Sequence, residues 1–472
     1  MSARPARRAA RRPLRAAAAP DAAGRRIPPP PAMTTARAAP RRTATAKGKA
    51  SDAPAPAGPP AVWRPGVDAV DDGEALQYDP TAYDTLHAFA LKWPCLSFDV
   101  LPDALGERRT EFPHTMFLAA GTQAASRAAN TVSLLRLARL GRAGHGLDAP
   151  GSSSEDSDSD GDDDDPVLHA RSVSVASGVN RVRSAPAAPG LVAAWLENGS
   201  VAVYDMRGGL GELEAADDNK PTRPRAAKQP PLASASHGVE GYGLDWSRAA
   251  PGRLAAGDCG AGLRVWDPRD GGASWAVSAP LTGGHTASVE DVQWSPTEGT
   301  VLATGSADAS IAVWDTRAKG RPQLTVPRAH AADVNVITWS RLATYMLASG
   351  GDDGAVAVWD LRSLKAGADV ARLAHHRGPV TSLEWSPHES SMLVSCGEDA
   401  QTAVWDLAVE RDPDEEAALG AGAAAADAVP PQLLFVHAGQ ADVKEAHWHP
   451  HIPGMLAATA ADGFNVFRPA NL

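Results

Sequence analysis

The chain has 472 residues, of which 43% are hydrophobic and 21% charged, and its formal net charge is −11. This content supports a sizeable core and excludes a wholly disordered chain. No apolar run approaches the roughly eighteen residues of a spanning helix, so we expect a soluble protein that needs no membrane. The three cysteines are too scattered for a disulfide framework or a zinc cluster, which favours a reducing compartment.

The first fifty residues are strongly basic. They hold eleven Arg and two Lys against Asp21 alone, a net charge of +12 that leaves −23 for the rest of the chain. Arginine pairs, alanine tracts and prolines cannot build a packed core, so residues 1–77 are predicted to be a disordered, basic and Pro-rich region. A nuclear import signal, an organelle transit peptide and low-complexity sequence without a role all fit this composition. A start at Met33 would remove most of the arginine pairs.

A second charge extreme is the segment 152–165, with eight acids in fourteen residues. Self-repulsion keeps such a run extended, so we expect an acidic loop over 142–166. It either aids solubility alone or tethers a strongly basic partner, such as a histone or a ribosomal protein, by long-range attraction. Direct binding of nucleic acid is disfavoured because phosphates repel the acids. The candidate partner-binding residues are Asp156, Asp158, Asp160, Asp162, Asp163, Asp164 and Asp165.

A repeat with fixed internal spacing fills the second half of the chain. Trp-Asp pairs begin at Trp266, Trp314, Trp359 and Trp405, which are 48, 45 and 46 residues apart. A histidine stands 29 residues before each of them, and another tryptophan follows nine residues after each histidine. Strand-like runs bounded by turn residues leave room for four short strands in each unit. With two less regular units before them and a last one over 433–467, they predict a propeller of seven blades.

This pattern resembles the WD-repeat family, in which a His, a Ser or Thr, an Asp and a Trp form a hydrogen-bonded set inside each blade. The resemblance implies an all-β, seven-bladed WD-repeat β-propeller. The matching sets are His285, Thr304, Asp308 and Trp314; His330, Ser349, Asp353 and Trp359; and His376, Ser395, Asp399 and Trp405. In the blade that begins at His237, Gly260 takes the place of the Asp and Asp258 stands two places early, so we expect an incomplete or rearranged set. Repetition argues against a hydrolase, because an active site needs one asymmetric constellation.

The stretch before the first blade predicts an N-terminal helix over 78–92. Tyr83, Leu86, Phe89 and Ala90 fall on one helical stripe, with Pro80 near its start. Residues 93–101 then alternate like a strand, and we expect this strand to close the ring by pairing with the last blade. The propeller is predicted to span 93–468.

The motif Trp93-Pro94-Cys95-Leu96-Ser97-Phe98-Asp99, followed by His114-Thr115-Met116, resembles the histone-binding WD proteins of chromatin-assembly and retinoblastoma-binding complexes. Within that group the chain is most similar to the glutamate-rich WD-repeat ribosome-assembly chaperones, from about Tyr78 to Phe467. The resemblance implies a non-catalytic chaperone of the nucleus and nucleolus that escorts the third protein of the large ribosomal subunit. A histone-binding chromatin assembly factor is the alternative.

The same resemblance implies a groove between the N-terminal helix and an acidic, Pro-ended insertion at 408–431, which would bind a basic amphipathic helix. Leu86 and Phe89 would supply its apolar contacts, unless they pack on the propeller instead. Its acids and its Pro-Pro end would be Asp412, Asp414, Glu415, Glu416, Pro430 and Pro431. A second contact surface is expected at the mouth of the ring, just ahead of the inner strands, from Tyr242, Glu290, Asn335, Thr381 and Lys444.

Two further patterns leave alternatives open. Trp-Asp-x-Arg occurs at 266–269, 314–317 and 359–362, and it resembles the motif by which WD proteins dock to the adaptor of cullin-RING ubiquitin ligases. The histidines His447, His449 and His451 either ligate a metal or lie in a surface turn after a strand. The turn fits better because no second ligand cluster accompanies them, so we expect no metal and no cofactor.

Overall fold

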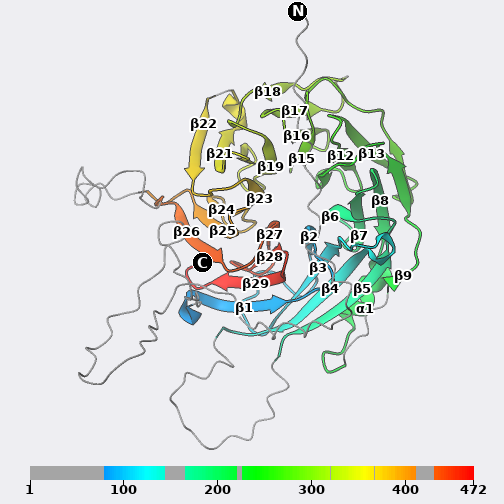
Figure 1. The fold of residues 1–472 in the computed structure, drawn as a ribbon, viewed down its shortest axis with the longest axis vertical. Helices are drawn as coiled ribbons and strands as arrows, with labels where there is room; N and C mark the ends of the chain where they lie inside the picture. Colours follow the sequence, from blue (N-terminus) through cyan, green and yellow to red (C-terminus); the bar gives the residue numbers. More distant parts are fainter. Residues whose placement is uncertain (1–78, 144–164, 221–225, 319, 366, 411–429) are drawn as a thin grey trace, which may run out of the picture. The chain divides into compact units, whose positions relative to one another are not determined.

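The computed structural model describes residues 79–143, 165–220, 226–318, 320–365, 367–410 and 430–472. The basic region 1–77, most of the acidic loop and most of the Pro-ended insertion lie outside these residues. In the described part of the chain, seven sheets follow one another around a central axis (Figure 1). The predicted seven-bladed propeller is confirmed.

We number the sheets as blades 1 to 7 in the order of their innermost strands. Blades 1 to 3 contain β2 (Ser97–Leu101), β3 (His114–Gly121), β4 (Thr131–Leu140), β5 (Val167–Ser174) and β9 (Ala226–Ala227); β6 (Val179–Ser184), β7 (Leu191–Leu196), β8 (Ser200–Asp205) and β10 (Ala233–Ser236); and β11 (Gly243–Trp246), β12 (Leu254–Gly257), β13 (Leu263–Arg269) and β14 (Ser274–Val277). Blades 4 to 6 contain β15 (Val289–Trp294), β16 (Val301–Ser306), β17 (Ile311–Asp315) and β18 (Leu324–Val326); β19 (Val334–Trp339), β20 (Met346–Gly351), β21 (Ala355–Asp360) and β22 (Asp369–Ala374); and β23 (Val380–Trp385), β24 (Met392–Gly397), β25 (Gln401–Asp406) and β26 (Leu433–Ala438). Blade 7 contains β27 (Glu445–Trp448), β28 (Leu456–Ala460), β29 (Gly463–Pro469) and β1 (Tyr83–Phe89).

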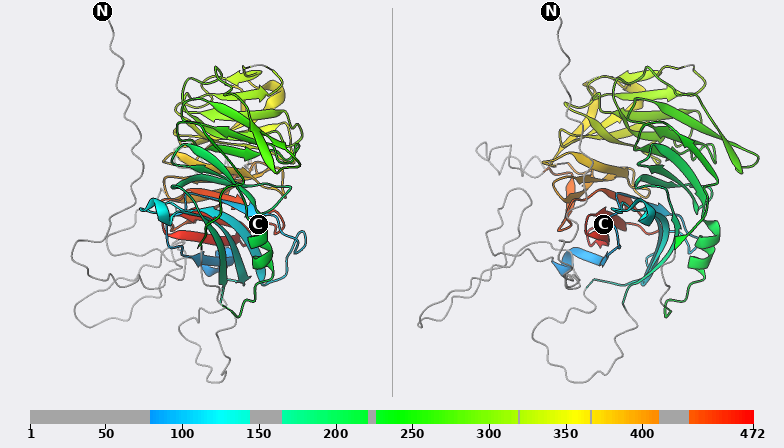
Figure 2. Two further views of the ribbon diagram at one scale, coloured as in Figure 1. Left: turned by 90° about the vertical axis from the view of Figure 1, so that its right-hand side faces the viewer. Right: turned by 45° about the vertical axis from the view of Figure 1, so that its right-hand side comes forward.

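The middle strands of the blades are mostly apolar and buried, because both faces of a blade pack on neighbouring blades. All six residues of β7 and all five of β28 are buried. One α-helix is present in the described residues, α1 (Arg207–Glu214), and it buries Leu210 and Leu213. It lies against β4 and β5 of blade 1 (Figure 2). The core is therefore a ring of layers between blades, with α1 as an outer cover on one of them.

The predicted helix over 78–92 is wrong. A single 3-10 turn at Pro80–Ala82 precedes β1, and Tyr83–Phe89 is a strand that pairs antiparallel with β29. The sequence fits both periods, since Tyr83, Thr85 and Phe89 also belong to an alternating pattern. The strand is favoured because β29 would otherwise present an unpaired edge and its apolar flank to water.

The ring is closed by β1 and not by residues 93–101. Within that stretch Ser97–Leu101 forms β2, which pairs with β3 of blade 1. Leu433–Ala438, expected in the last blade, is the outer strand of blade 6 and pairs with β25. Blade 7 instead takes its outer strand from the N-terminal side of the described chain, so β1 and β29 lie side by side (Figure 1).

Blades 4, 5 and 6 each hold a hydrogen-bonded set of His, Ser or Thr, Asp and Trp. In blade 5, His330 Nδ1 lies 2.9 Å from Asp353 and its Nε2 lies 2.8 Å from Ser349 Oγ, which accepts from Trp359 Nε1 at 2.9 Å. Equivalent contacts in blades 4 and 6 join His285, Thr304, Asp308 and Trp314, and His376, Ser395, Asp399 and Trp405. The members satisfy one another where water is excluded, which avoids the cost of unpaired buried polar groups.

The set of blade 3 is incomplete, but not at the residue that the sequence pattern indicated. Asp258 does supply the carboxylate, with Oδ2 3.0 Å from His237 Nδ1. The hydroxyl is what is absent, since Ala256 occupies the position ten residues before Trp266 where the other sets have Ser or Thr. As a result, His237 Nε2 and Trp266 Nε1 are buried without a hydrogen-bond partner among the described residues.

Ala256→Ser should therefore stabilise the protein by about 1 kcal/mol, because one hydroxyl would pair two buried nitrogen atoms. Chemical unfolding of the variant and its parent measures the difference. Ala255→Ser is the matched control: Ala255 is equally buried on the same strand but points to the opposite face, among Val265, Val289 and Val292. There the hydroxyl should destabilise. Equal effects of the two substitutions would contradict the assignment of Ala256.

Candidate functional site

The strand β1 lies between the ends of the two acidic segments. On one side, His87 Nε2 donates to the carbonyl oxygen of Gly141 at 3.1 Å. The backbone N–H of Ala143 donates to the backbone carbonyl oxygen of Asp84 at 2.8 Å. These residues stand where the acidic loop begins. On the other side, the ring of Tyr83 packs edge-on against Phe435 at 5.2 Å, a few residues after the insertion ends. Three stretches that are far apart in the sequence therefore meet at one edge of the propeller.

A β-bulge between Tyr83 and Thr85 explains how Tyr83 and Phe89 come to face opposite sides of β1. Tyr83 enters the core cluster shared by blades 6 and 7, and its hydroxyl lies 2.9 Å from His437 Nδ1. After the bulge, Thr85 Oγ1 donates to the carbonyl of Gly141, and Phe89 packs in the cluster shared by blades 7 and 1. The strand thus fastens the closing blade to both of its neighbours.

The two side chains predicted to make apolar contacts with a partner already pack largely within the propeller. Phe89 is 8% exposed, and Leu86 is half-buried against the cluster that contains Tyr83. Both pack on the propeller because they belong to a paired strand and not to a free helix face. Both prolines at the end of the insertion, Pro430 and Pro431, are half-buried.

Most of the predicted acidic residues lie outside the described part of the chain. These are Asp156, Asp158, Asp160, Asp162, Asp163, Asp164, Asp412, Asp414, Glu415 and Glu416. Asp165, near the end of the acidic loop, is described; it is exposed and lies two residues before β5. The structure therefore locates where the acidic segments attach to the propeller.

The five predicted mouth residues are all half-buried at or just before the inner strands. Asn335 Nδ2 donates to Asp352 at 2.8 Å, Lys444 Nζ pairs with Asp442 at 2.5 Å, and the carbonyl of Tyr242 accepts from Arg181. Thr381 Oγ1 lies 3.4 Å from the carbonyl of Val443. Acidic residues stand in β15, at Glu290, and in turns or loops next to the innermost strands, at Glu240, Asp333, Asp352, Glu398 and Asp442. We call this set the acidic rim.

Backbone hydrogen bonds hold the acidic rim together. Asp352 N–H donates to the carbonyl of Asp333 at 2.9 Å, and Glu398 N–H donates to that of Pro379 at 2.9 Å. In this way, the turn that follows the second strand of a blade is held beside the loop that precedes the innermost strand of the same blade. In blade 5 this contact brings the acidic residues Asp333 and Asp352 next to each other.

A set of carboxylates inside the channel was not foreseen from the sequence. Each lies on an innermost strand and accepts a backbone N–H from the innermost strand of the following blade. We call these the axial carboxylates: Asp99 (from Ser184), Asp245 (from Trp294), Asp291 (from Ile337), Glu384 (from Trp448) and Glu445 (from Phe98), at 2.7 to 3.0 Å. They join neighbouring blades where no sheet hydrogen bonds do.

Glu445 is the most heavily paired of the axial carboxylates. Arg181 and Arg183 of blade 2 both bind it, and His447 Nε2 lies 3.4 Å away. Burial alone would raise the pKa of Glu445, but the two guanidinium groups and His447 hold it well below its usual range. Burial likewise opposes the charge of His447, yet Glu384 and Glu445 together raise the pKa of this imidazole to about 9. The channel thus contains a neutralised ionic cluster.

The histidines predicted as candidate metal ligands, His447 and His449, form hydrogen bonds with other groups of the protein. His447 pairs with Glu384 in the channel, whereas His449 Nδ1 accepts the backbone N–H groups of His451 and Ile452 in a turn. No three His, Cys, Asp or Glu side chains of the described ranges are placed so that they could hold a metal ion. None of the described helices is long and apolar enough to cross a membrane.

The arginines of the Trp-Asp-x-Arg motifs differ in their pairing. Arg317 binds Asp315 and Arg362 binds Asp360, each at 2.6 Å, with side chains that are 70% and 67% exposed. Arg362 also stacks 3.9 Å above the ring of Tyr345. In the first motif Asp267 pairs with Arg253 instead. Two of the three motifs therefore present the same exposed ion pair.

Comparison with known proteins places the chain in a family. Residues 73–140 match the family model of the histone-binding protein RBBP4 and the corresponding component of the CAF1 complex, and residues 279–315, 321–360 and 367–406 match the WD domain, G-beta repeat. The chain is 46% identical to protein HEAT STRESS TOLERANT DWD 1 of Arabidopsis thaliana, over 90% of this chain and 95% of that protein.

Two further relatives are similar over comparable lengths. The chain is 45% identical to glutamate-rich WD repeat-containing protein 1 of Dictyostelium discoideum, over 88% of this chain and 86% of that one. It is 38% identical to ribosome assembly protein rrb1 of Schizosaccharomyces pombe, over 86% and 84%. This chain therefore belongs to the WD-repeat family that contains glutamate-rich WD repeat-containing protein 1 and ribosome assembly protein rrb1.

Proposed function

We propose that the protein is a non-catalytic chaperone and scaffold that binds a basic ribosomal protein, the third of the large subunit, during ribosome assembly in the nucleus and nucleolus. The observation that carries this proposal is the position of β1 between the attachment points of both acidic segments. A basic chain bound at this edge is within reach of both segments, and two linked charged contacts bind more tightly than one. The name of one relative, ribosome assembly protein rrb1, supports the assembly role.

The acidic rim offers a further surface of the same sign. Because Arg and Lys residues of a ribosomal protein normally contact RNA, they need a negatively charged cover before assembly. The acidic segments and the rim would provide it without any reaction, and the sets of His, Ser or Thr, Asp and Trp act as structure in this proposal.

Two alternatives use parts of the same molecule. A histone-binding role is favoured by the match of residues 73–140 to a histone-binding family model. A substrate receptor of a cullin-RING ligase is favoured by the exposed pairs Asp315–Arg317 and Asp360–Arg362, and a relative carries DWD in its name. In that case the two arginines would contact the ligase adaptor.

Affinity purification of the tagged protein from nuclear extract at moderate salt tests the proposal. The variant replaces the eight acids of 155–165 by their amides, and the control replaces Ser152, Ser153 and Ser154 by alanine without changing charge. We expect the parent and the control to recover one large-subunit protein selectively, and the amide variant to recover about tenfold less. Recovery of core histones without that protein would overturn the proposal. The proposal would also be overturned by recovery of ligase subunits without that protein, if this recovery is lost in Arg317→Ala/Arg362→Ala.

A further inference from the structure

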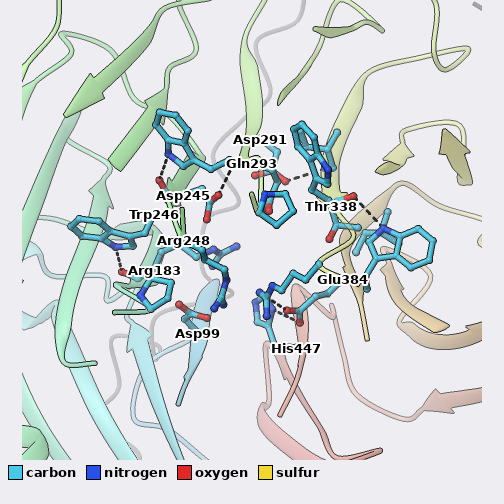
Figure 3. A pocket seen from close by; sticks show the side chains of 18 of the residues that line it. Asp99, Arg183, Asp245, Trp246, Arg248, Asp291, Gln293, Thr338, Glu384 and His447 are labelled. Carbon is cyan, nitrogen blue, oxygen red and sulfur yellow. Dashed lines mark hydrogen bonds and ion pairs between the residues drawn. The ribbon is translucent and has the colours of Figure 1, made fainter. Parts of the chain in front are cut away.

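A polar pocket lies on the propeller axis at the end where the inner strands finish (Figure 3). Its wall includes tryptophans that end these strands, such as Trp246 and Trp294, and residues just beyond them, Arg248 and Arg341. Toward the mouth, Arg181 reaches from blade 2 to Glu445 of blade 7 and also donates to the carbonyl of Tyr242 in blade 3. These contacts cross the channel between the pocket and the acidic rim, so the two are separate surfaces.

Two guanidinium groups of this pocket have few partners. Arg248 forms no hydrogen bond or ion pair with any residue that the structure describes, and in Figure 3 its side chain extends into the pocket. Arg341 makes one long contact of 3.5 Å with Glu384. Burial and the neighbouring charge of Arg341 lower the pKa of Arg248 to about 10. Each guanidinium has five N–H donors, so most of these donors have no acceptor among the described residues.

The carboxylates of the pocket are occupied by other groups. Glu384 accepts from Trp448 N–H at 2.9 Å and lies 3.1 Å from His447 Nδ1. Asp99, Asp245 and Asp291 each accept a backbone N–H of the next blade. Burial raises the pKa of Asp245 to about 7, which favours its neutral form. The acids therefore leave the charge of the two arginines without a direct partner at bonding distance, apart from the long contact to Glu384.

We propose that this pocket binds a small tetrahedral oxyanion, a phosphate or a phosphate monoester, between Arg248 and Arg341. Phosphate oxygens match the planar fork of N–H donors that guanidinium groups present, and charge-assisted bonds of this kind are the strong ones. Gln293 lines the same wall, and its side chain makes no hydrogen bond within the described residues, so its amide is a third donor. A cationic ligand would instead be repelled by the positive charges of both arginines.

Isothermal titration calorimetry of the full chain, with thermal unfolding in parallel, tests the site with inorganic phosphate and with glycerol 3-phosphate. We expect saturable binding of at least one probe and a rise in melting temperature. The stronger probe tells whether free phosphate or an ester is preferred. Arg248→Gln should weaken binding by about tenfold or more, because bonds from a charged donor are lost.

Two further variants complete the test: one should strengthen binding, and the other is a control. Asp245→Asn keeps an oxygen for Trp294 N–H but removes the negative charge that Asp245 carries above about pH 7, so in titrations at a pH of about 8 it should strengthen binding severalfold. Arg317→Gln, an exposed arginine paired with Asp315, should bind like the parent. If Arg248→Gln fails to fold, Arg341→Gln takes its place with the same expectation. The absence of saturable binding of either probe, or equal binding by the arginine variants and Arg317→Gln, would overturn the proposal.

Discussion

Replacing Glu445 by alanine should lower the free energy of unfolding by about 3–5 kcal/mol. Glu445 is 3% exposed, and its removal leaves Arg181 and Arg183 in the channel without their principal counter-ion. The backbone N–H of Phe98 would lose its acceptor as well. Breaking a buried pair on one side is costly because the remaining charges cannot return to water. Urea unfolding followed by tryptophan fluorescence measures the change.

The matched control is Asp442→Asn, which removes the charge but tolerates the left-handed backbone of this residue (φ 58°). Asp442 also pairs with a basic residue, Lys444, but its side chain is 46% exposed. Its loss should change the stability by no more than about 0.5 kcal/mol. If the two variants were equally stable, the ionic cluster at Glu445 would not contribute as the structure indicates.

Removal of residues 1–89 should destabilise the propeller by more than about 5 kcal/mol, since each buried aromatic side chain that is lost is worth about 3–5 kcal/mol. Tyr83 and Phe89 are both buried, and β29 would lose its only outer neighbour in the described structure. The exposed edge of β29 would also promote aggregation. Melting temperature and size-exclusion chromatography report both effects.

Removal of residues 1–78 is the control for that deletion, because it leaves β1 in place. This shorter deletion should melt close to the parent and elute as the parent does. A loss of stability as large as that of the longer deletion would contradict the assignment of ring closure to β1.

The propeller could be predicted from the sequence because its signal is local and repeated. The histidine, the two tryptophans and the turn residues recur at fixed offsets, and each repeat folds into one blade. The same regularity gave the positions of the hydrogen-bonded sets, down to His330, Ser349 and Trp359. The defect in blade 3 was assigned to the wrong residue because the shifted Asp258 departs visibly from the repeat, whereas Ala256 has no polar atom that would mark the missing hydroxyl.

The helix prediction failed because β1 is determined by a distant partner. The spacing of Tyr83, Leu86 and Phe89 fits one face of a helix, so the local sequence pattern alone favours a helix. Nothing nearby in the sequence reveals that Phe89 faces Phe464 across a strand pair. The axial carboxylates were missed for the same reason, since each finds its donor on another blade. A detectable signal was present, however: Asp245 and Glu384 each directly precede a repeated tryptophan inside an apolar strand.

The pairing of Tyr83 with Pro469 has a consequence for how the chain acquires its fold. Strand β1 is synthesised first among the described strands, and its partner β29 is synthesised last. Blades 1 to 6 can form in order as the chain emerges, but the seventh must wait until β27 to β29 have also been synthesised. Contacts over such a separation form slowly because a long loop has to be closed. A nascent propeller of this kind therefore stays open at one seam until β29 is available, and that interval is when it most needs protection.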